Sequence, residues 1–224
     1  MKSQLPIPLK FNPRIKGSDY IRILGTNSVI SRFETTKGHN YQETHFALSD
    51  KRKYMPSARL FMPYYSQVIK ANEGLVKLCD ANNHPIPSDE VEELYKKLTS
   101  DSWTRLNNYF IQDNLGRLLN ESFMSFKKKE DKQIITLERD MLEQCVMEDY
   151  VVDLEFNKQG FPVRKSNEQD YIRGKNIKFW YPRKDSVARF FASSVRALLD
   201  CSGNPSDSFE GLGVFECAEG APKN

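Results

Sequence analysis

The segment from Val187 to Cys201 constrains the fold most, because its side chains alternate in kind with a period of two. Successive side chains of a β-strand point to opposite faces of the sheet, so this alternation predicts strands with two different faces. The side chains expected to face inward are small or apolar: Ala188, Phe190, Ala192, Ser194, Ala197, Leu199 and Cys201. Those expected to face outward share no common chemistry: Phe191, Ser193, Arg196, Leu198 and Asp200. The alternation slips at Val195-Arg196, which predicts a bulge or a tight bend between two strands.

The composition of this part of the chain is also unusual. The chain contains 20 lysines, yet none lies between Asp185 and Pro222. Residues 202–208 are rich in Ser, Gly, Asn and Pro and predict a loop, and residues 212–214 predict a closing core strand. An outward face that mixes aromatic, arginine and small polar residues resembles a binding surface in composition. An ordinary hairpin with a mixed outer face fits these residues equally well.

The remainder of the chain predicts an α+β fold. Three helices are expected, at 41–53 after the N-cap Asn40, at 58–71, and at 88–99 with Ser88 as N-cap. Pro63 would move the start of the second helix toward that residue. Strands are predicted at 20–24, 75–79, 103–106 (with Trp103 as a core anchor) and 177–181, whereas 137–154 fits helix or loop and 157–173 fits a loop. Because helices dominate the first half and strands the end, we expect an antiparallel sheet.

Composition bounds the domain organisation and the location. A hydrophobic share of 39% with 12% aromatic residues is typical of a globular chain. Residues 1–24 are expected to form an extended arm and the first strand, and residues 25–224 a domain. The N-terminus lacks the apolar stretch of a signal peptide, and no apolar run is long enough for a membrane span. We therefore expect cytosolic synthesis and no membrane span, which is compatible with later display on a virion or a cell surface.

No motif of a metal site or of a catalytic centre is present in the sequence. The four cysteines form no CxxC pair, which disfavours zinc. The acidic residues of 138–153 are irregularly spaced and lack the glycine-centred loop of a cation site. Since no nucleophile is paired with a base in a known motif, we expect no enzyme, no cofactor and no metal. The alternative is an enzyme that uses Cys201 or Cys217, two thiols near each other in the sequence.

A second alternative is a protein associated with nucleic acid. Its candidate contacts are Arg14, Lys16 and the run Lys127–Lys129. The net charge of +3 is small, and the lysine run is followed at once by Glu130 and Asp131. A broad phosphate-binding surface needs a stronger basic bias, so nucleic-acid binding is disfavoured.

The tail VARFFASSVRALLDCSGNPSDSFEGLGV resembles the variable region of diversity-generating retroelement target proteins, in particular the archaeal and archaeal-virus members. Those proteins end in a similar Ala-Arg-Phe … Leu-Gly-Val frame. The resemblance is most specific over residues 179–217, weaker upstream, and does not cover residues 1–24. It implies a C-type-lectin-like fold, related in architecture to formylglycine-generating enzymes, with two main helices plus an inserted helix and a variable region at about 187–214. Cys201 and Cys217 lie in no motif of those enzymes, and a shared fold alone does not transfer chemistry.

The resemblance also implies how the surface varies. In this family a reverse transcriptase misreads template adenines, so that Asn codons become many others, but not those of Lys, Gln, Met or Trp. Residues 185–222 contain none of these four, although Glu210 departs from the expected codon pattern. The implied variable residues are Phe191, Ser193, Val195, Arg196, Leu198, Asp200, Ser202, Gly203, Ser206, Asp207, Phe209 and Gly211. The implied fixed frame is Ala188, Arg189, Phe190, Ala192, Ser194, Ala197, Leu199, Cys201, Pro205, Ser208, Leu212, Gly213 and Val214.

The function implied is that of a non-enzymatic ligand-binding protein for receptor recognition. Its partner would be a protein or a glycan that contacts the face formed by residues 191–211. The aromatic residues Phe191 and Phe209 would anchor the contact, and Arg196, Asp200 and Asp207 would set its charge complementarity. This expectation requires that the outward side chains be accessible, because only surface positions tolerate free substitution.

Overall fold

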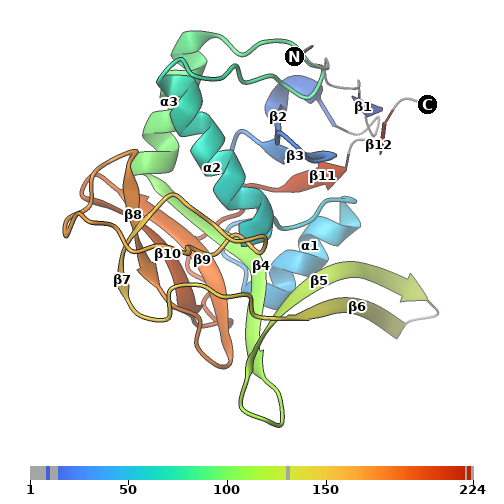
Figure 1. Cartoon of the computed structure of the whole chain (residues 1–224). Helices are drawn as coiled ribbons and strands as arrows, with labels where there is room; N and C mark the ends of the chain where they lie inside the picture. Colours follow the sequence, from blue (N-terminus) through green and yellow to red (C-terminus); the bar gives the residue numbers. More distant parts are fainter. Residues whose placement is uncertain (1–8, 11–14, 130–131, 220, 223–224) are drawn as a thin grey trace.

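The structure, a computed structural model, describes residues 9–10, 15–129, 132–219 and 221–222, with side chains for 15–123 and 136–219. The described helices are α1 (Tyr41–Asp50), α2 (Ala58–Asn72), α3 (Ser88–Ser100) and the short 3₁₀ helix η1 (Gly17–Asp19). The first six strands are β1 (Leu9–Lys10), β2 (Tyr20–Arg22), β3 (Ser28–Ser31), β4 (Ser102–Gln112), β5 (Leu118–Lys129) and β6 (Lys132–Met141). The others are β7 (Tyr150–Asp153), β8 (Asn176–Trp180), β9 (Ser186–Ser193), β10 (Arg196–Gly203), β11 (Cys217–Glu219) and β12 (Ala221–Pro222). The fold is therefore α+β, as expected (Figure 1).

The main sheet has seven strands in the order β6-β5-β4-β9-β10-β8-β7. It is mixed rather than antiparallel, because β8 and β10 run parallel, with Leu199 opposite Phe179. The chain passes from β8 beyond β10 to form β9, and β10 then folds back between β9 and β8. A smaller sheet has the order β11-β3-β2, and β1 pairs with β12 near the chain ends.

The three α-helices follow the periodicity closely, with local shifts. Helix α1 begins after Asn40, whose side chain accepts from the Glu43 backbone N–H while the Glu43 carboxylate accepts from the Asn40 N–H. Helix α2 begins at Ala58, not near Pro63, because Asn108 accepts the Ala58 N–H and Pro63 lies on the exposed side. Helix α3 has Pro87 rather than Ser88 as its N-cap.

Two other expectations differ from the structure. Residues 75–79 form a bend and an irregular segment, and pairing is limited to its end, where Cys79 bridges Pro85 and accepts from the Arg22 N–H of β2 at 3.1 Å. The acidic segment 137–154 contains the end of β6 and the whole of β7. The loop at 157–173 is confirmed. Strand β2 packs with the rest of the fold, since Ile21 and Ile23 belong to the main core.

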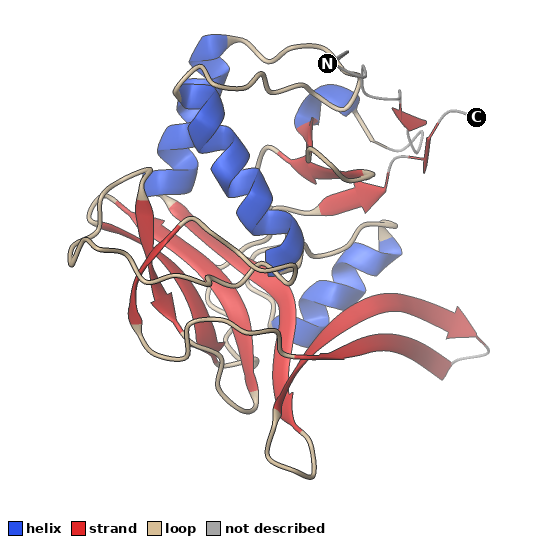
Figure 2. Cartoon of the chain, in the orientation of Figure 1, coloured by secondary structure: helices blue, strands red, loops and turns tan. Residues whose placement is uncertain are grey.

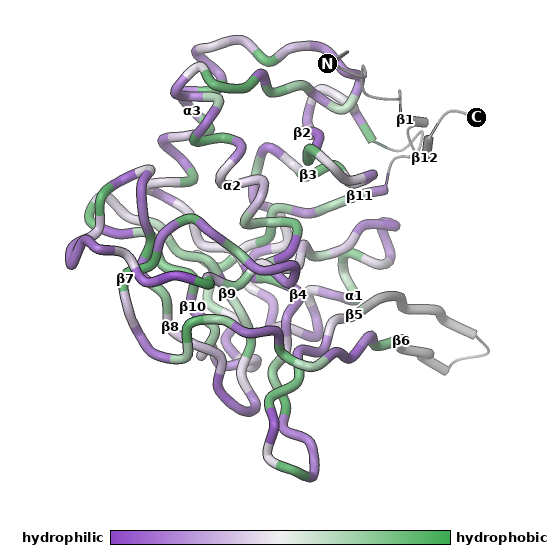
Figure 3. Tube along the Cα trace, viewed as in Figure 1, coloured by the Kyte–Doolittle hydropathy of each residue, from purple (hydrophilic) through white to green (hydrophobic). Residues whose placement is uncertain are grey.

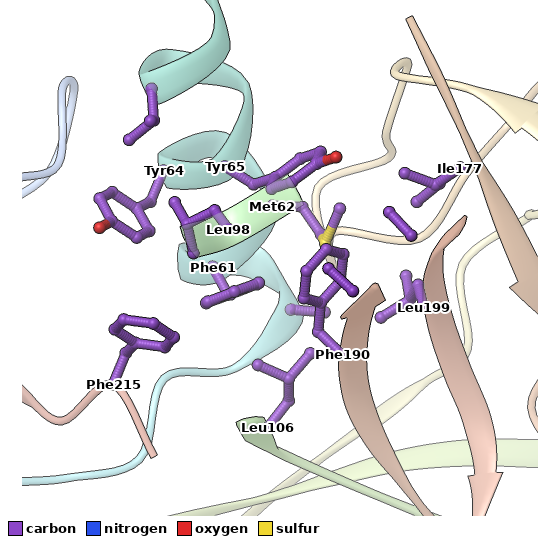
Figure 4. Packing of buried hydrophobic residues seen from close by; sticks show 14 of the residues in the cluster. Phe61, Met62, Tyr64, Tyr65, Leu98, Leu106, Ile177, Phe190, Leu199 and Phe215 are labelled. Atoms are coloured by element: carbon purple, nitrogen blue, oxygen red, sulfur yellow. The ribbon is translucent and has the colours of Figure 1, made fainter. Parts of the chain in front are cut away.

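The core lies between the central strands and the pair α2 and α3, which cover one face of the sheet (Figures 1 and 4). The Phe61 and Tyr65 rings of α2 lie 5.1 and 4.9 Å from the Phe190 ring of β9. Leu199 of β10 and Leu106 of β4 are fully buried in the same cluster. Burying side chains of this size stabilises the fold by about 1.5–3 kcal/mol each, so the central strands are held firmly from one side.

The β5–β6 hairpin extends away from the rest of the sheet, and α1 lies beside its base (Figure 2). Hydrophobic residues follow the central strands, whereas much of the connecting loop chain is hydrophilic (Figure 3). Among the described residues, no helix is both long and apolar enough to cross a bilayer.

Candidate binding surface on the C-terminal hairpin

Strands β9 and β10 form a tight antiparallel hairpin in which Ser193 pairs with Arg196 and Ser194-Val195 make the turn. The predicted bend is therefore confirmed. The inner side chains of both strands are 0–2% exposed and belong to the main core; they are Ala188, Phe190, Ala192, Ala197, Leu199 and Cys201. Ser194 departs from the expected inner set, because it lies in the turn and is exposed.

The opposite face of the sheet carries two cross-strand rows of large and charged side chains. The first row consists of Trp103, Phe191, Leu198 and Lys178, on β4, β9, β10 and β8 in that order. The second row consists of Arg105, Arg189, Asp200 and Trp180 on the same four strands. Residues directly opposite each other on neighbouring strands are close enough to interact. The outer face is therefore a continuous surface built from four strands.

The aromatic residues of this face form a cluster that is flanked by arginines. The Phe191 ring lies 4.2 Å from the Trp103 ring, and the Phe209 ring meets Trp103 edge-on at 5.3 Å. The Arg196 guanidinium lies 5.0 Å from the centre of the Phe191 ring, and that of Arg189 lies 6.0 Å from the Trp103 ring. Rings and guanidinium groups in this arrangement attract each other and offer both apolar area and charge to a ligand.

Accessibility divides the twelve implied variable residues into two groups. Val195 is 75% exposed and Phe209 43%; Ser206 and Gly211 are also exposed, and Phe191, Ser193, Arg196, Ser202 and Asp207 are partly exposed. Leu198 and Asp200, at 4% and 2%, and Gly203 are buried. The expectation that Leu198 and Asp200 face solvent is wrong: they point to the outer face, but their neighbours cover them. We call six accessible residues on β4, β9, β10, their turn and the following loop the outer patch: Trp103, Phe191, Ser193, Val195, Arg196 and Phe209.

Asp200 is buried because it is the partner of Arg189. Its carboxylate accepts from Arg189 Nε at 2.7 Å and from the Ser202 backbone N–H and hydroxyl at 2.8 Å. Arg189 Nη1 also donates to Asp207 at 2.7 Å, which ties the loop after β10 to the sheet. A carboxylate with this set of partners cannot be replaced at will, since the loss of one partner leaves a guanidinium in a low-dielectric site.

Arg105 also binds the loop that follows β10. It is 1% exposed, and its Nη2 donates to the backbone oxygens of His39, at 2.6 Å, and of Asp207. Burial is the main cause that lowers the Arg105 pKa, to about 10, and the guanidinium stays protonated at neutral pH. The residues 204–211 are therefore fastened to the sheet through two arginines on neighbouring strands.

Sequence reasoning missed the part of this face that comes from outside the tail. Trp103 was expected in the core, but it is half-buried on the outer face, opposite Phe191. The available signal was strand alternation: Thr104 faces the core and is fully buried, so its neighbours Trp103 and Arg105 take the opposite face. Lys178 and Trp180 join the face only because β8 pairs with β10, and a parallel pairing between distant segments leaves no local pattern.

The cysteine chemistry considered from the sequence is disfavoured by burial. Cys201 and Cys217 are free thiols, 0% exposed, and burial raises the pKa of both well above the usual value. A thiol acts as a nucleophile only as its thiolate. Within the described part of the chain, no group of three or more His, Cys, Asp or Glu residues is placed to hold a metal ion.

The basic residues considered for nucleic acid fall largely outside the described part. Arg14 and the side chains of Lys127–Lys129 lie outside the described residues. Lys16 forms an ion pair with Asp19 at 3.3 Å.

Comparison of the chain with protein-family models, with curated proteins and with solved structures found no match.

Proposed function

We propose that this chain is a non-enzymatic ligand-binding protein that recognises its target through the outer patch on its C-terminal hairpin. The observation that carries the proposal is the division of β9 and β10 into two faces. One face is fully buried under α2 and α3, and the other presents aromatic and arginine side chains from several strands. A surface that is supported rigidly from behind loses little conformational entropy on binding.

The outer patch has the chemistry of a protein-binding hot spot. Trp, Tyr and Arg are enriched where binding energy concentrates, and large rings supply contact area at low entropy cost. Trp103, Phe191 and Phe209 would supply that area here, while Arg196 would supply charge and hydrogen bonds. A protein target fits this combination, and a glycan could stack on the same rings.

We further propose that the outer-patch residues of β9, β10 and the following loop are diversified by a retroelement and that the fold is C-type-lectin-like. The absence of Lys, Gln, Met and Trp from residues 185–222 supports this, as does the resemblance of the tail to variable regions of that family. Free variation then applies to the accessible positions, above all Phe191, Ser193, Val195, Arg196 and Phe209. Leu198 and Asp200 are constrained by burial, so the range of residues they tolerate is narrow.

The neighbouring DNA of the gene tests the diversification directly. We expect a near-copy of the codons for residues 187–214, with adenines at the codons of the implied variable residues, and a reverse-transcriptase gene nearby. A neighbourhood with neither of these would refute diversification. The recognition role would then rest on the outer patch alone. It is tested by measuring whether substitution of Phe191 and Arg196 weakens binding to the target.

A further inference from the structure

A cavity of about 790 Å³ lies between the start of α2 and the base of the β5–β6 hairpin, and no residue of the outer patch lines it. Its volume falls in the range of ligand pockets. One wall comes from the start of α2 and from β4 and β5, and includes Ser57, Arg59 and Asn120. Four carboxylates also line the cavity, those of Glu138, Asp140, Glu143 and Glu219.

The amide of Asn120 is oriented by a chain of hydrogen bonds that begins at the backbone. The Ala58 N–H donates to Asn108 Oδ1 at 2.7 Å, so the other end of the Asn108 amide must be its nitrogen. That nitrogen donates to Asn120 Oδ1 at 3.0 Å. The Asn120 side-chain nitrogen is therefore placed away from Asn108, and it forms no hydrogen bond with a described residue.

This unpartnered donor lies at the cavity although its residue is 93% buried, since Asn120 is 7% exposed and lines the cavity. The neighbouring Asn107 is different: its oxygen accepts from the Phe123 N–H at 2.8 Å and its nitrogen donates to the Phe123 carbonyl at 2.8 Å. Buried polar groups in folded proteins are satisfied by protein, water or ligand. The free N–H groups of Asn120 are thus available to an acceptor, from water or from a ligand, that enters the cavity.

The same face of the sheet also carries acceptors and negative charge. Asp140 pairs with Asn120, and Glu138 with Ser122, across β5 and β6, which places all four side chains on the same face. Among the described residues, neither Glu138 nor Asp140 nor Glu219 forms an ion pair. Against the four carboxylates, the cavity has the basic side chains of Arg59 and Lys158 only. The uncompensated carboxylates attract a cation.

We propose that this cavity binds a short basic peptide segment. The peptide carbonyl oxygens would accept from Asn120 and from the donors at the start of α2, and a lysine or arginine side chain would pair with Glu138 and Asp140. A peptide supplies both groups in one molecule, whereas a neutral saccharide would leave the carboxylates without a counter-charge. The site shares no residue with the outer patch, so it stands apart from the proposed recognition function.

The test uses the full chain and a fluorescently labelled peptide, acetyl-Ala-Lys-Ala-Lys-Ala-amide, titrated by anisotropy. Its counterpart with glutamate in place of lysine and a neutral trisaccharide serve as probes of the other chemistries. We expect the basic peptide alone to bind, and Glu138→Gln with Asp140→Asn to weaken it about tenfold. The control Glu73→Gln with Glu93→Gln removes the same charge from exposed positions, one directly after α2 and one on α3, and should change affinity less than about twofold.

Several outcomes would overturn the proposal. These are no binding of the basic peptide, an equal loss in the control pair, or binding of the trisaccharide in preference to the peptide. Asn120→Ala should also weaken the peptide, with a thermal unfolding curve to show that the variant is folded. Phe191→Ala with Arg196→Ala should leave peptide binding unchanged, so a failure of the outer-patch hypothesis remains distinguishable from a failure of this one.

Discussion

Replacing Asp200 by alanine tests the most consequential difference between the sequence expectation and the structure. The sequence assigns Asp200 to a freely variable outer set, whereas in the structure it is 2% exposed and bonded to Arg189 and Ser202. Asp200→Ala removes the carboxylate and leaves the Arg189 side chain, which is 19% exposed, with Asp207 as its remaining ion partner. The fold should therefore lose stability, and the loop after β10 should loosen.

The size of the loss follows from the environment of the pair. Removing one partner from a fully buried ion pair costs about 3–5 kcal/mol. Arg189 keeps Asp207 and some contact with solvent, which reduces the cost to about 2–3 kcal/mol. Asp200→Asn keeps an acceptor of the same shape and should cost less, about 1–2 kcal/mol.

The assay is urea unfolding followed by tryptophan fluorescence, in which Trp103 reports on the outer face. Ser193→Ala serves as the matched control, because Ser193 is partly exposed on the same face and its side chain makes no described hydrogen bond. This substitution should change the free energy of unfolding by less than about 0.5 kcal/mol. If Asp200→Ala costs no more than Ser193→Ala, the assignment of Asp200 as a buried counter-ion is wrong.

Three further predictions follow from burial. Leu198→Ala should destabilise the fold by about 2–3 kcal/mol, whereas Val195→Ala, 75% exposed in the turn, should be neutral within about 0.5 kcal/mol in the same urea assay; equal effects would contradict the assigned accessibility. Burial lowers the pKa of His45 to about 3. Below about pH 6.5, His45 is therefore protonated in the unfolded chain but stays neutral in the folded chain. Stability should then fall by about 1.4 kcal/mol per pH unit between pH 6 and 4; His45→Leu should remove that part of the slope, and an unchanged slope would show that His45 is not its source. Cys201 and Cys217 should resist iodoacetamide in the native chain and react after denaturation; rapid native labelling of either would revive the thiol-enzyme alternative.

The sequence was sufficient where a local pattern has a single structural solution. Asn40 followed three residues later by Glu43 predicts a helix start, and the structure has both reciprocal bonds. The alternation of residues 187–201 predicts two strands with a bend at Val195, and the inner residues are all in the core except Ser194. In each case neighbouring residues determine the outcome.

The sequence was insufficient where contacts between distant segments determine the local structure. Residues 75–79 alternate like a strand, but only the end of the segment pairs, through single contacts of Cys79 with Pro85 and with β2. Leu198 has the pattern of an outer residue, yet β8 and β9 flank it on both sides and it is buried. The cavity beside Asn120 depends on a contact between Asn108 and the start of α2, fifty residues earlier in the chain. Periodicity reports which face a side chain takes, but not what covers that face.

The most direct measurement of the central claim is the sequencing of many independent copies of the gene from one host population. The expected result is that substitutions concentrate at Phe191, Ser193, Val195, Arg196 and Phe209, while Phe190, Ala192 and Leu199 stay unchanged. Substitutions spread evenly over both faces of the hairpin, or confined to synonymous changes, would contradict the claim that this surface is supported by a constant core and altered for recognition.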